Sequence, residues 1–464
     1  MFLINNNLIL KIFNLYFLFI SFFEKINSQT SDMDKIGDLL PGIQNSYLYV
    51  SNNYMLHYWF VTSQTKSNKL IFWFNGGPGC SSLDGLLSEI GPYLINSDGK
   101  TLRKNNYSWN KYSSIVFIES PAGVGYSYSI NGNITTNDDN TAINNYEAIK
   151  QFLQIHSNYQ NHNIYLMGES YAGVYLPLLA SKIIDGQKKF KINFKGMAIG
   201  NAPIFAYSHG IINEKFWEVF SNHCCNGCVD NCNIYNFDEK KDSKCIDESN
   251  KIFSALWGGK FNPYDLYRKC ENTSNKNNNK INKYPMLINL LFSKNKKINL
   301  LFKNKKINNK LIYSTGSPCI DDSAINNYMR QPSVKLSLHI PQNQKFNWEV
   351  CNLKLNSIYN TQYEDMTLII KKVLNSNIST LLYYGDTDSV CNFFIGQKFA
   401  SQLGYQLKNP SHPWFLNGQV GGFVTEYFGN LTYLTVKGIG HLVPKWAPSQ
   451  AEYIIKQFLM GEKI

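Results

Sequence analysis

The strongest candidate for a reactive side chain in this sequence is Ser170, which stands in the run Gly168-Glu169-Ser170-Tyr171-Ala172-Gly173. A short apolar run, 163–167, precedes it, and a stretch with helical spacing, 172–184, follows it. A serine at such a strand-to-helix turn is typical of a nucleophile elbow, although the usual G-x-S-x-G pattern has glycine where Ala172 stands. Because alanine is also small, a tight turn is still compatible with the sequence. For this run alone, the alternative is an ordinary turn without chemistry.

A glycine-rich loop, Asn75-Gly76-Gly77-Pro78-Gly79-Cys80-Ser81-Ser82, follows the apolar run 69–74. Glycines let backbone N–H groups approach a developing oxyanion without an intervening side chain. Pro78 has no N–H, so the glycines are the expected donors. A phosphate-binding loop is the alternative, but it would end in Gly-Lys-Ser or Gly-Lys-Thr, which this loop lacks.

An acid and a histidine complete a set that could activate the serine. Asp388 lies in the run 385–392 and His441 in the run 438–444, and each run directly follows an apolar segment. A histidine can take the serine proton while a carboxylate orients the imidazole ring. The chain order is serine, acid, histidine, as in the α/β-hydrolases. The three residues together therefore predict a catalytic triad.

The elements that must position these residues alternate between strand-like and helix-like segments. The helical segments are 141–155 and 172–184, and the short apolar runs that predict buried strands are 69–74, 114–118, 163–167, 196–200, 380–384 and 431–436. Alternation of this kind predicts a doubly wound, mostly parallel α/β sheet. The fold class that we expect is therefore the α/β-hydrolase fold.

The domain organisation follows from where this alternation stops. From about residue 205 the cysteines cluster and the strand signals disappear, and they resume after residue 336. We therefore expect a core in two parts, 29–204 and 336–464, interrupted by a cap insertion at 205–335. Within the cap, the Lys/Asn-rich tract 271–310 is expected to be an exposed low-complexity insertion.

Composition and charge exclude several classes of protein. The chain has 464 residues, of which 44% are hydrophobic and 17% charged, so it is neither disordered nor a coiled coil, and it lacks the glycine repeat of a collagen. Its formal net charge is +12, but the tract 271–310 carries ten lysines and one glutamate, which leaves only +3 for the rest. Because the positive charge is confined to one tract, we expect no nucleic-acid partner.

The N-terminus predicts export. An apolar stretch follows Lys11 and ends before Glu24, which is short for a membrane span and indicates a signal peptide over residues 1–28. A retained signal anchor is the alternative. Ten cysteines agree with an oxidising destination. Five sequons for N-glycosylation also agree, and they lie at Asn106, Asn133, Asn272, Asn377 and Asn430. No second apolar segment follows, so we expect no stable membrane anchor.

These runs resemble the serine carboxypeptidase family, of the carboxypeptidase Y and lysosomal cathepsin A type. The matching stretches are 73–82, 119–127, 168–177 and the runs around Asp388 and His441, and the resemblance extends from about residue 34 to the C-terminus outside 271–310. The pair Cys224-Cys225 makes the sequence more similar to the cathepsin A branch of this family than to the yeast-type branch. The resemblance implies a largely helical cap that disulfides hold together.

The resemblance also implies a role for each residue of the triad. Ser170 would be the nucleophile, and His441 would be its general base and then the acid to the leaving amine. Asp388, rather than Asp386, would orient the imidazole. No metal and no organic cofactor is implied, and a structural zinc site at the clustered cysteines is disfavoured by export and by the lack of suitably spaced histidines.

Further residues are assigned to the substrate by resemblance. The backbone N–H groups of Gly77 and Tyr171 would bind the oxyanion. Leu442 would shape the substrate pocket, and Cys391 would be a free, partly buried thiol at that pocket. The free α-carboxylate of the substrate would be bound by Asn75, Gly76, Glu89 and Glu169, with Trp73 in support.

The disulfides are also implied by the resemblance alone. The expected pairs are Cys80–Cys351, Cys224–Cys245, Cys225–Cys232 and Cys270–Cys319. Cys228 departs from the family pattern and is left over beside Cys391. Its presence leaves Cys225–Cys228 open as an alternative pairing, because sequence alone does not fix connectivity.

We therefore expect a serine-type carboxypeptidase that releases single, hydrophobic C-terminal residues through an acyl-enzyme at acid pH, in the lysosome or outside the cell. Its partners would be peptides with a free C-terminal carboxylate, with a homodimer and lysosomal enzyme partners left open. One alternative is an acyltransferase on the same scaffold, and Asn75, Glu89 and Glu169 favour the peptidase over it. A second alternative is a protective partner that stabilises other lysosomal enzymes.

Overall fold

The computed structural model describes residues 43–50, 53–203, 261–270, 319–341, 347–363 and 365–464. The expected signal peptide, most of the expected cap and the whole tract 271–310 lie outside the described residues, so their boundaries stay predictions. Within the described part of the chain, none of the helices combines the length and the apolar character that a membrane crossing requires.

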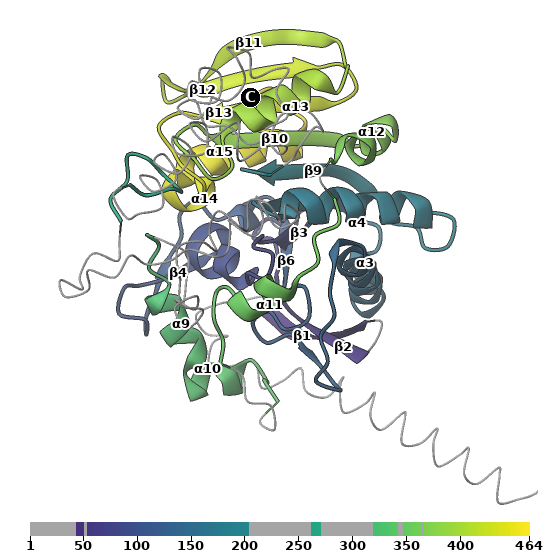
Figure 1. Cartoon of the computed structure of the whole chain (residues 1–464), viewed down its shortest axis with the longest axis vertical. Coiled ribbons are helices and arrows are strands. Elements are labelled where there is room, and N and C mark those ends of the chain that lie inside the picture. The colour runs from purple at the N-terminus through teal and green to yellow at the C-terminus, as the bar shows by residue number, and fades with distance from the viewer. Residues whose placement is uncertain (1–42, 51–52, 204–260, 271–318, 342–346, 364) are drawn as a thin grey trace, which may run out of the picture.

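The core is an eleven-stranded sheet in the order β1-β2-β6-β3-β8-β9-β10-β13-β12-β11, with β7 paired to β2. In Figure 1 the sheet runs from β11 at the top to β1 and β2 near the bottom. The strands from β6 to β13 in this order pair in parallel, and both flanks are antiparallel. The strands are β1 (Ile43–Val50), β2 (Tyr54–Val61), β3 (Lys69–Phe74), β6 (Ser114–Ile118), β7 (Tyr128–Ser129), β8 (Asn163–Glu169), β9 (Phe194–Gly200), β10 (Ser379–Gly385), β11 (Leu407–Leu416), β12 (Gln419–Tyr427) and β13 (Leu431–Val436). A separate hairpin pairs β4 (Tyr93–Ile95) with β5 (Leu102–Lys104).

Helices cover both faces of the sheet because successive strand residues point to opposite sides. Leu70, Phe72 and Phe74 of β3 pack in one apolar cluster, while Ile71 and Trp73 pack in the other. The first cluster contains α3 (Asp138–Ile155), α4 (Ala172–Gly186), α12 (Thr367–Asn375) and α13 (Phe393–Gln402). The second contains the π-helical turn η3 (Gly85–Ile90), α9 (Ser323–Arg330), α10 (Pro332–Ser337), α14 (Val443–Trp446) and α15 (Pro448–Met460). In Figure 1, α3, α4 and α12 lie to the right of the sheet and α14 and α15 to its left.

The described part of the chain also contains three short helical segments, namely the 3-10 turns η4 (Trp109–Lys111) and η5 (Ser157–Tyr159) and the helix α11 (Leu353–Ile358). The six apolar runs that the sequence indicated are β3, β6, β8, β9, β10 and β13, and the two helical segments are α3 and α4. The expected α/β-hydrolase fold class is confirmed.

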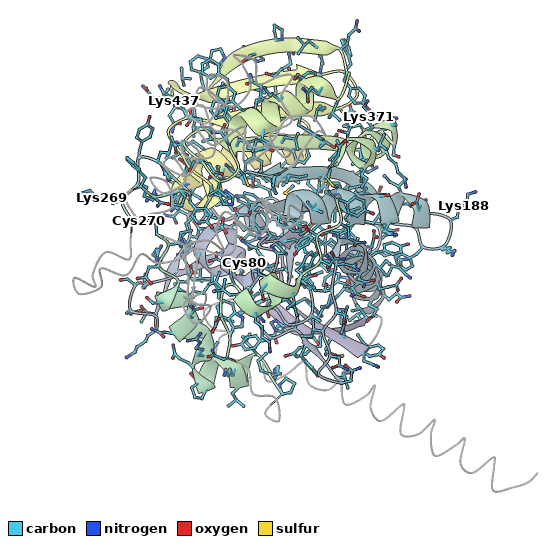
Figure 2. All side chains as sticks on the ribbon, viewed as in Figure 1. Cys80, Lys188, Lys269, Cys270, Lys371 and Lys437 are labelled. Atoms are coloured by element: carbon cyan, nitrogen blue, oxygen red, sulfur yellow. A yellow bond between two sulfur atoms is a disulfide. The ribbon has the colours of Figure 1, made fainter. Side chains whose placement is uncertain are left out.

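Two of the expected disulfides lie within the described residues, and both are formed. Cys80 is bonded to Cys351, and Cys270 to Cys319. Figure 2 shows Cys80 near the middle of the molecule and Cys270 at its periphery, while Lys188, Lys371 and Lys437 project outward from the ribbon. The other expected pairs involve Cys224, Cys225, Cys232 and Cys245, which, like Cys228, lie outside the described residues.

The topology brings the candidate residues to one edge of the sheet. Parallel strands end at the same edge, and in open α/β sheets this carboxyl edge is where ligands bind. The glycine-rich loop follows β3, the turn at Ser170 follows β8, and the runs with Asp388 and His441 follow β10 and β13. The fold alone therefore places these four segments next to one another.

Candidate active site

Ser170 occupies a sharp turn between β8 and α4. Its φ is 58°, a left-handed backbone conformation that is rare for residues other than glycine. The turn is so tight that it has no room for a side chain at position 168. A Cβ on Gly168 would lie 2.2 Å from the Phe74 carbonyl oxygen and 2.8 Å from Ala172 Cβ. Gly168 thus makes the space that Ala172 needs, which explains why alanine is accepted at the second small position of the elbow.

Asp388 and His441 are joined at the same edge of the sheet. His441 Nδ1 lies 2.6 Å from Asp388 Oδ2, and both residues are buried. The backbone N–H groups of Val390 and Cys391 donate to the same carboxylate at 2.8 and 3.1 Å, so its orientation is fixed by its own loop. Ser170 and His441 line one cleft. A histidine that a carboxylate orients in this way could take the proton of a serine in the same cleft.

Asp386 serves a different purpose from Asp388. Its Oδ1 accepts the backbone N–H of Gly438 at 2.6 Å, which ties the end of β10 to the loop that carries His441. Burial raises the pKa of Asp386, and the backbone hydrogen bonds that it accepts oppose that rise. Of the two acids in the run, the structure therefore brings only Asp388 to the imidazole.

Asn201 is a residue of this site that sequence reasoning missed. It directly follows β9 and has a φ of 40°. Its Nδ2 donates to Asp388 Oδ2 at 2.9 Å, and its Oδ1 accepts the backbone N–H of Gly385 at 3.1 Å. The sequence signal that could have identified Asn201 is a polar residue at the carboxyl end of a buried parallel strand. Asn201 therefore holds the acid from the neighbouring strand.

Tyr264 is a second residue that the sequence did not single out. Its carbonyl oxygen accepts the backbone N–H of His441 at 2.7 Å, and its ring centroid lies 5.2 Å from the imidazole. Tyr264, Ile320 and Leu442 belong to one apolar cluster, and all three line the cleft. Cys391 belongs to the same cluster and is buried and free, but the residues that line the described part of the cleft do not include it. The structure thus places Leu442 at the expected pocket and Cys391 behind it.

The glycine-rich loop packs directly against the elbow. A Cβ on Gly76 would lie 2.3 Å from the backbone nitrogen of Tyr171 and 2.8 Å from Ser170 Cβ. Gly77 has a φ of +117°, which favours glycine. Tyr171 directly precedes α4, where the helix dipole favours negative charge. The expected oxyanion donors, Gly77 and Tyr171, are therefore on adjoining segments beside Ser170.

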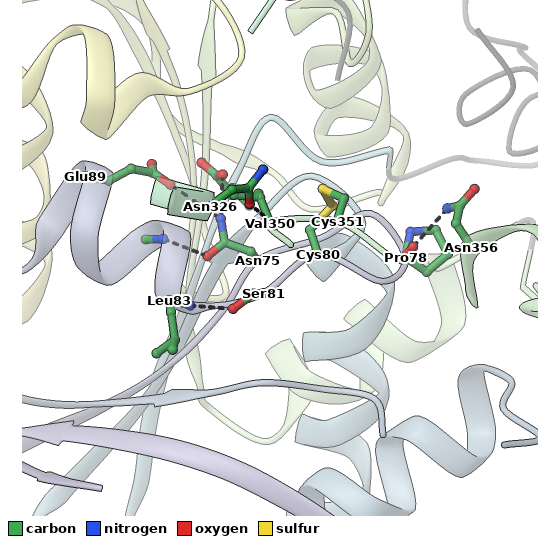
Figure 3. Close-up of a disulfide and its surroundings, with 12 residues drawn as sticks. Asn75, Pro78, Cys80, Ser81, Leu83, Glu89, Asn326, Val350, Cys351 and Asn356 are labelled. Atoms are coloured by element: carbon green, nitrogen blue, oxygen red, sulfur yellow. Dashed lines mark hydrogen bonds between the residues drawn. A yellow bond between two sulfur atoms is a disulfide. The ribbon is translucent and has the colours of Figure 1, made fainter. Parts of the chain in front are cut away.

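Asn75 is held with its amide group in one orientation. Its Oδ1 accepts hydrogen bonds from the Trp73 indole at 2.7 Å and from the Gly85 backbone N–H at 3.2 Å. Its Nδ2 is therefore directed at two carboxyl groups, and it donates to Glu169 at 3.0 Å and to Glu89 at 3.4 Å. Figure 3 shows Asn75 and Glu89 in this arrangement. The structure thus brings together all the side chains expected to bind a carboxylate.

The two glutamates are buried and share a hydrogen bond. Burial raises the pKa of both carboxyl groups, to about 8 for Glu89 and well above its usual value for Glu169, where the charge of Glu89 is the second cause. Asp84, which lines the cleft, raises both values further by its charge. One carboxyl must be protonated to donate to the other. At acid pH, the pair therefore offers hydrogen-bond donors rather than negative charge.

Glu119 forms a buried network under the glycine-rich loop, which was also missed. Its Oε1 accepts from Ser81 Oγ at 2.5 Å and from the Trp348 indole at 2.8 Å. Its Oε2 lies 2.8 Å from His57 Nδ1 and accepts the Tyr126 backbone N–H at 2.9 Å. The run 119–127 was noted only for its resemblance to the family. The structure gives Glu119 the role of fixing the loop through Ser81.

Among the described residues, one cluster has the spacing of a metal site. Asp388, Cys391 and His441 each offer a ligand atom within 4.8 Å of the others. Burial raises the pKa of the Cys391 thiol, and a protonated thiol is a poor ligand. Asp388 and His441 are already bonded to each other. Their closeness is explained by the pairing of acid and histidine.

Four of the five sequons lie in the described part of the chain, and their asparagines are all exposed. They are Asn106, Asn133, Asn377 and Asn430, whereas Asn272 lies outside the described residues. Asn430 Nδ2 donates to Asn377 Oδ1 at 2.6 Å, so these two sequons are neighbours on the surface. Glycosylation at each position stays a prediction.

A serine at a strained strand-to-helix turn, with an acid and a histidine at the ends of neighbouring strands, defines a hydrolase of the α/β-hydrolase fold. The model of the serine carboxypeptidase family matches residues 42–461. The chain therefore belongs to the serine carboxypeptidase family.

Two relatives and one solved structure illustrate the similarity. The lysosomal protective protein of Mus musculus is 35% identical over 469 residues, which cover 94% of this chain and 95% of the relative. The serine carboxypeptidase ctsa-4.1 of Caenorhabditis elegans is 32% identical over 97% of this chain and 98% of its own length. The crystal structure of Kex1(delta)p, a prohormone-processing carboxypeptidase from Saccharomyces cerevisiae, has a TM-score of 0.67 at 21% identity, covering 91% of this chain and 93% of that chain. This last likeness shows the shared fold.

Proposed function

We propose that this protein is a serine carboxypeptidase that releases single C-terminal residues from peptides, with Ser170 as nucleophile, His441 as general base and Asp388 as the group that orients the imidazole. The observation that carries the proposal is Asn75, whose amide joins two buried carboxyl groups beside Ser170. A site with this cluster is suited to a substrate that ends in a carboxylate, which an ordinary esterase does not need to recognise.

The chemistry follows from the positions of the groups. Ser170 Oγ attacks the last peptide carbonyl while His441 Nε2 takes its proton. The negative oxygen that forms is bound by the backbone N–H groups of Gly77 and Tyr171. When the C–N bond breaks, His441 returns the proton to the leaving amine, which departs as the free C-terminal amino acid. Water then attacks the acyl-enzyme with the same histidine as base.

Carboxylate recognition sets the working pH in this proposal. At acid pH Asn75, Glu89 and Glu169 donate hydrogen bonds to the substrate carboxylate, with Gly76 and Trp73 in support. Burial and the charge of Asp84 raise the pKa values of both glutamates, so each stays protonated until the pH approaches its raised pKa. Above that pH the glutamates ionise and repel the substrate carboxylate. Peptide cleavage should therefore be limited on the alkaline side, with an optimum at lower pH than for a substrate that lacks the carboxylate.

We propose that the cleft prefers hydrophobic residues at the C-terminal end of the peptide. Tyr264, Ile320 and Leu442 give the cleft an apolar wall next to His441. An apolar side chain that leaves water for such a wall gains roughly 25 cal/mol per Å² of buried surface. Cys391 supports this wall from behind, since it packs in the same cluster.

We also propose that the protein works in the secretory pathway, either in the lysosome or outside the cell. The exposed sequons and the disulfides support this location.

A second candidate function, stabilisation of other lysosomal enzymes, is favoured by one observation. The mouse relative at 35% identity bears the name lysosomal protective protein. Co-purification from the native source tests that role and the open question of a homodimer.

The deciding experiment compares three substrates with purified protein. A blocked dipeptide, its C-terminal amide and an acyl glucose ester are incubated at pH 5 with the protein and with Ser170→Ala as control. We expect release of the terminal amino acid from the dipeptide and no transfer of the acyl group to an added alcohol. Transfer without hydrolysis would favour the acyltransferase. Absence of any Ser170-dependent turnover would refute the proposal.

A further inference from the structure

Residues Cys351–Tyr363 connect the two segments that carry the proposed oxyanion donors. They begin at the disulfide to Cys80, beside the glycine-rich loop, and end next to the first residue of α3 and the Tyr171 side chain. We propose that these residues, which we call the brace, set the relative placement of the Gly77 and Tyr171 N–H groups. This inference rests on the proposed function, since it presupposes those two donors.

The first end of the brace is hydrogen-bonded to the glycine-rich loop. Asn352 donates its backbone N–H to the Gly79 carbonyl at 2.9 Å, and Asn356 Nδ2 donates to the Pro78 carbonyl at 2.8 Å, as Figure 3 shows. Leu355 packs so close that a Cβ on Gly79 would lie 3.0 Å from its Cδ2. Two consecutive carbonyls of the loop, directly after Gly77, are thus fixed by α11 and by Asn352, the residue that precedes this helix.

The other end of the brace is linked to Tyr171 by hydrogen bonds to the buried carboxyl group of Asp138. The Tyr171 hydroxyl donates to Asp138 Oδ1 at 2.8 Å. The opposite oxygen of Asp138 accepts the backbone N–H groups of Gln362 at 2.5 Å and Tyr363 at 3.3 Å. The ring of Tyr359, also in the brace, meets the Tyr171 ring edge-on at a centroid distance of 5.8 Å. Asp138 is therefore a positioning residue that acts through Tyr171.

The need for such a brace follows from how the two segments meet. Gly76 contacts the Tyr171 nitrogen so closely that a Cβ would lie 2.3 Å away, but the two segments belong to different strand ends, β3 and β8. A misplacement of about 1 Å at an active site can cost about 100-fold in rate. An element that binds both segments keeps that error small.

The test removes one anchor and leaves both donors in place. Tyr171→Phe deletes the hydroxyl that binds Asp138 but keeps the backbone N–H that would bind the oxyanion. The matched control is Tyr58→Phe, which deletes another buried hydroxyl, one that lies 3.0 Å from His156 Nε2 at the far end of α3. For a blocked dipeptide we expect kcat to fall about 10-fold in Tyr171→Phe with KM within about twofold. Tyr58→Phe should keep the wild-type kcat.

A second readout separates oxyanion binding from a general loss of structure. A peptide aldehyde forms a tetrahedral adduct with the serine, whose oxygen occupies the oxyanion position. Its Ki should rise in Tyr171→Phe by the factor by which kcat falls. The Ki of the blocked amino acid product, which forms no such adduct, should stay unchanged. Asn356→Ala, at the other end of the brace, should show the same pattern.

The possible outcomes are distinct. Equal kcat values in Tyr171→Phe and Tyr58→Phe, or a lower kcat without a change in the aldehyde Ki, would overturn the brace. If Tyr171→Phe is not recovered as folded protein, Asn356→Ala carries the same expectation and the same contrary result. A wild-type protein that releases no C-terminal residue would refute the proposed function instead.

Discussion

Asn201 donates from its Nδ2 to Asp388 Oδ2 at 2.9 Å, the same oxygen that lies 2.6 Å from His441 Nδ1. The two residues are 187 positions apart and lie at the ends of the paired strands β9 and β10. Because Asn201 also accepts the Gly385 N–H, its amide cannot turn without breaking both bonds. The acid is therefore held from outside its own loop.

Removing this amide should slow the reaction with little effect on binding. Asn201→Gly keeps the left-handed backbone conformation, since glycine accepts a φ of 40°, and deletes the bond to Asp388. We expect kcat for a blocked dipeptide to fall about 10- to 100-fold, the range that misplaced catalytic groups produce. Asn193→Gly is the control, because it deletes an amide bonded to Asn163 near the start of the same strand. Equal kcat values in both variants would show that Asn201 has no part in the triad.

Replacing the proposed nucleophile has a larger expected effect. Ser170→Ala should lower kcat by about a millionfold, since the members of a triad act as a unit. The fold, the Cys80–Cys351 disulfide and secretion should be unaffected, because alanine fits the same turn. Residual turnover of the dipeptide, measured at high enzyme concentration, is the readout. A variant that keeps more than a few per cent of the wild-type kcat would remove Ser170 from the mechanism.

The central sheet could be predicted from the sequence because its strands are buried on both faces. Such strands are continuous apolar runs, as in 69–74 and 114–118, and these became β3 and β6. The flanking strands β11 and β12 were not predicted. β11 is mostly exposed and contains prolines, β12 mixes exposed and buried residues and contains glycines, and the two strands pair with bulges, so no apolar run marks them.

Without the family resemblance, which assigned Glu89, the site could be predicted only where one segment carries both the reactive group and its local signal. Ser170, Asp388 and His441 each stand in such a run. Asn201 and Glu119 do not, since each acts on a residue that is distant in sequence, and a lone buried polar residue looks the same whether it supports a site or the core. Asp138 belongs to the same group, because its partners in the brace are more than 200 positions away.

The Lys/Asn tract 271–310 provides a prediction about processing. We expect limited trypsin to cut it first, because its lysines are concentrated in one low-complexity stretch. The disulfide Cys270–Cys319 spans the tract and should keep the two products joined. The nicked protein should give two bands on a reducing gel and one on a non-reducing gel. Cutting at other loops before the tract would contradict the expectation.

The buried glutamate pair predicts how stability depends on pH. Because the pKa values of Glu89 and Glu169 are raised on folding, the unfolded chain releases these protons at lower pH than the folded protein does. The free energy of unfolding should therefore fall as pH rises above about 4.3, by up to about 1.4 kcal/mol per pH unit for each proton.

Comparison with a variant isolates this contribution. In Glu89→Gln/Glu169→Gln, other buried groups such as Asp138, Asp386 and His156 still titrate, so their effects cancel in the difference. Urea midpoints between pH 4.5 and 7.5 are the measurement. We expect the wild type to lose more stability across this range than the variant. Parallel curves would mean that the pair titrates normally.

The same pair predicts a difference between substrates. A peptide needs protonated Glu89 and Glu169 to bind its carboxylate, so its KM should rise as the pH increases toward about 8, where Glu89 ionises. The matching C-terminal amide has no carboxylate, and its KM should stay nearly level. His441 must be neutral to act as a base, which favours higher pH for both substrates. The peptide should therefore have its optimum at a lower pH than the amide.

The double variant Glu89→Gln/Glu169→Gln tests the cause of this difference. Glutamine keeps an N–H donor at every pH, so the rise in KM for the peptide should disappear while turnover of the amide changes little. The control is Glu147→Gln, which removes a carboxyl group of α3 that is paired with Lys150 away from the cleft. The measurement is KM against pH for both substrates in the three proteins. If peptide and amide show the same pH dependence in the wild type, Asn75 and the two glutamates do not bind the substrate carboxylate, even if Ser170 is the nucleophile.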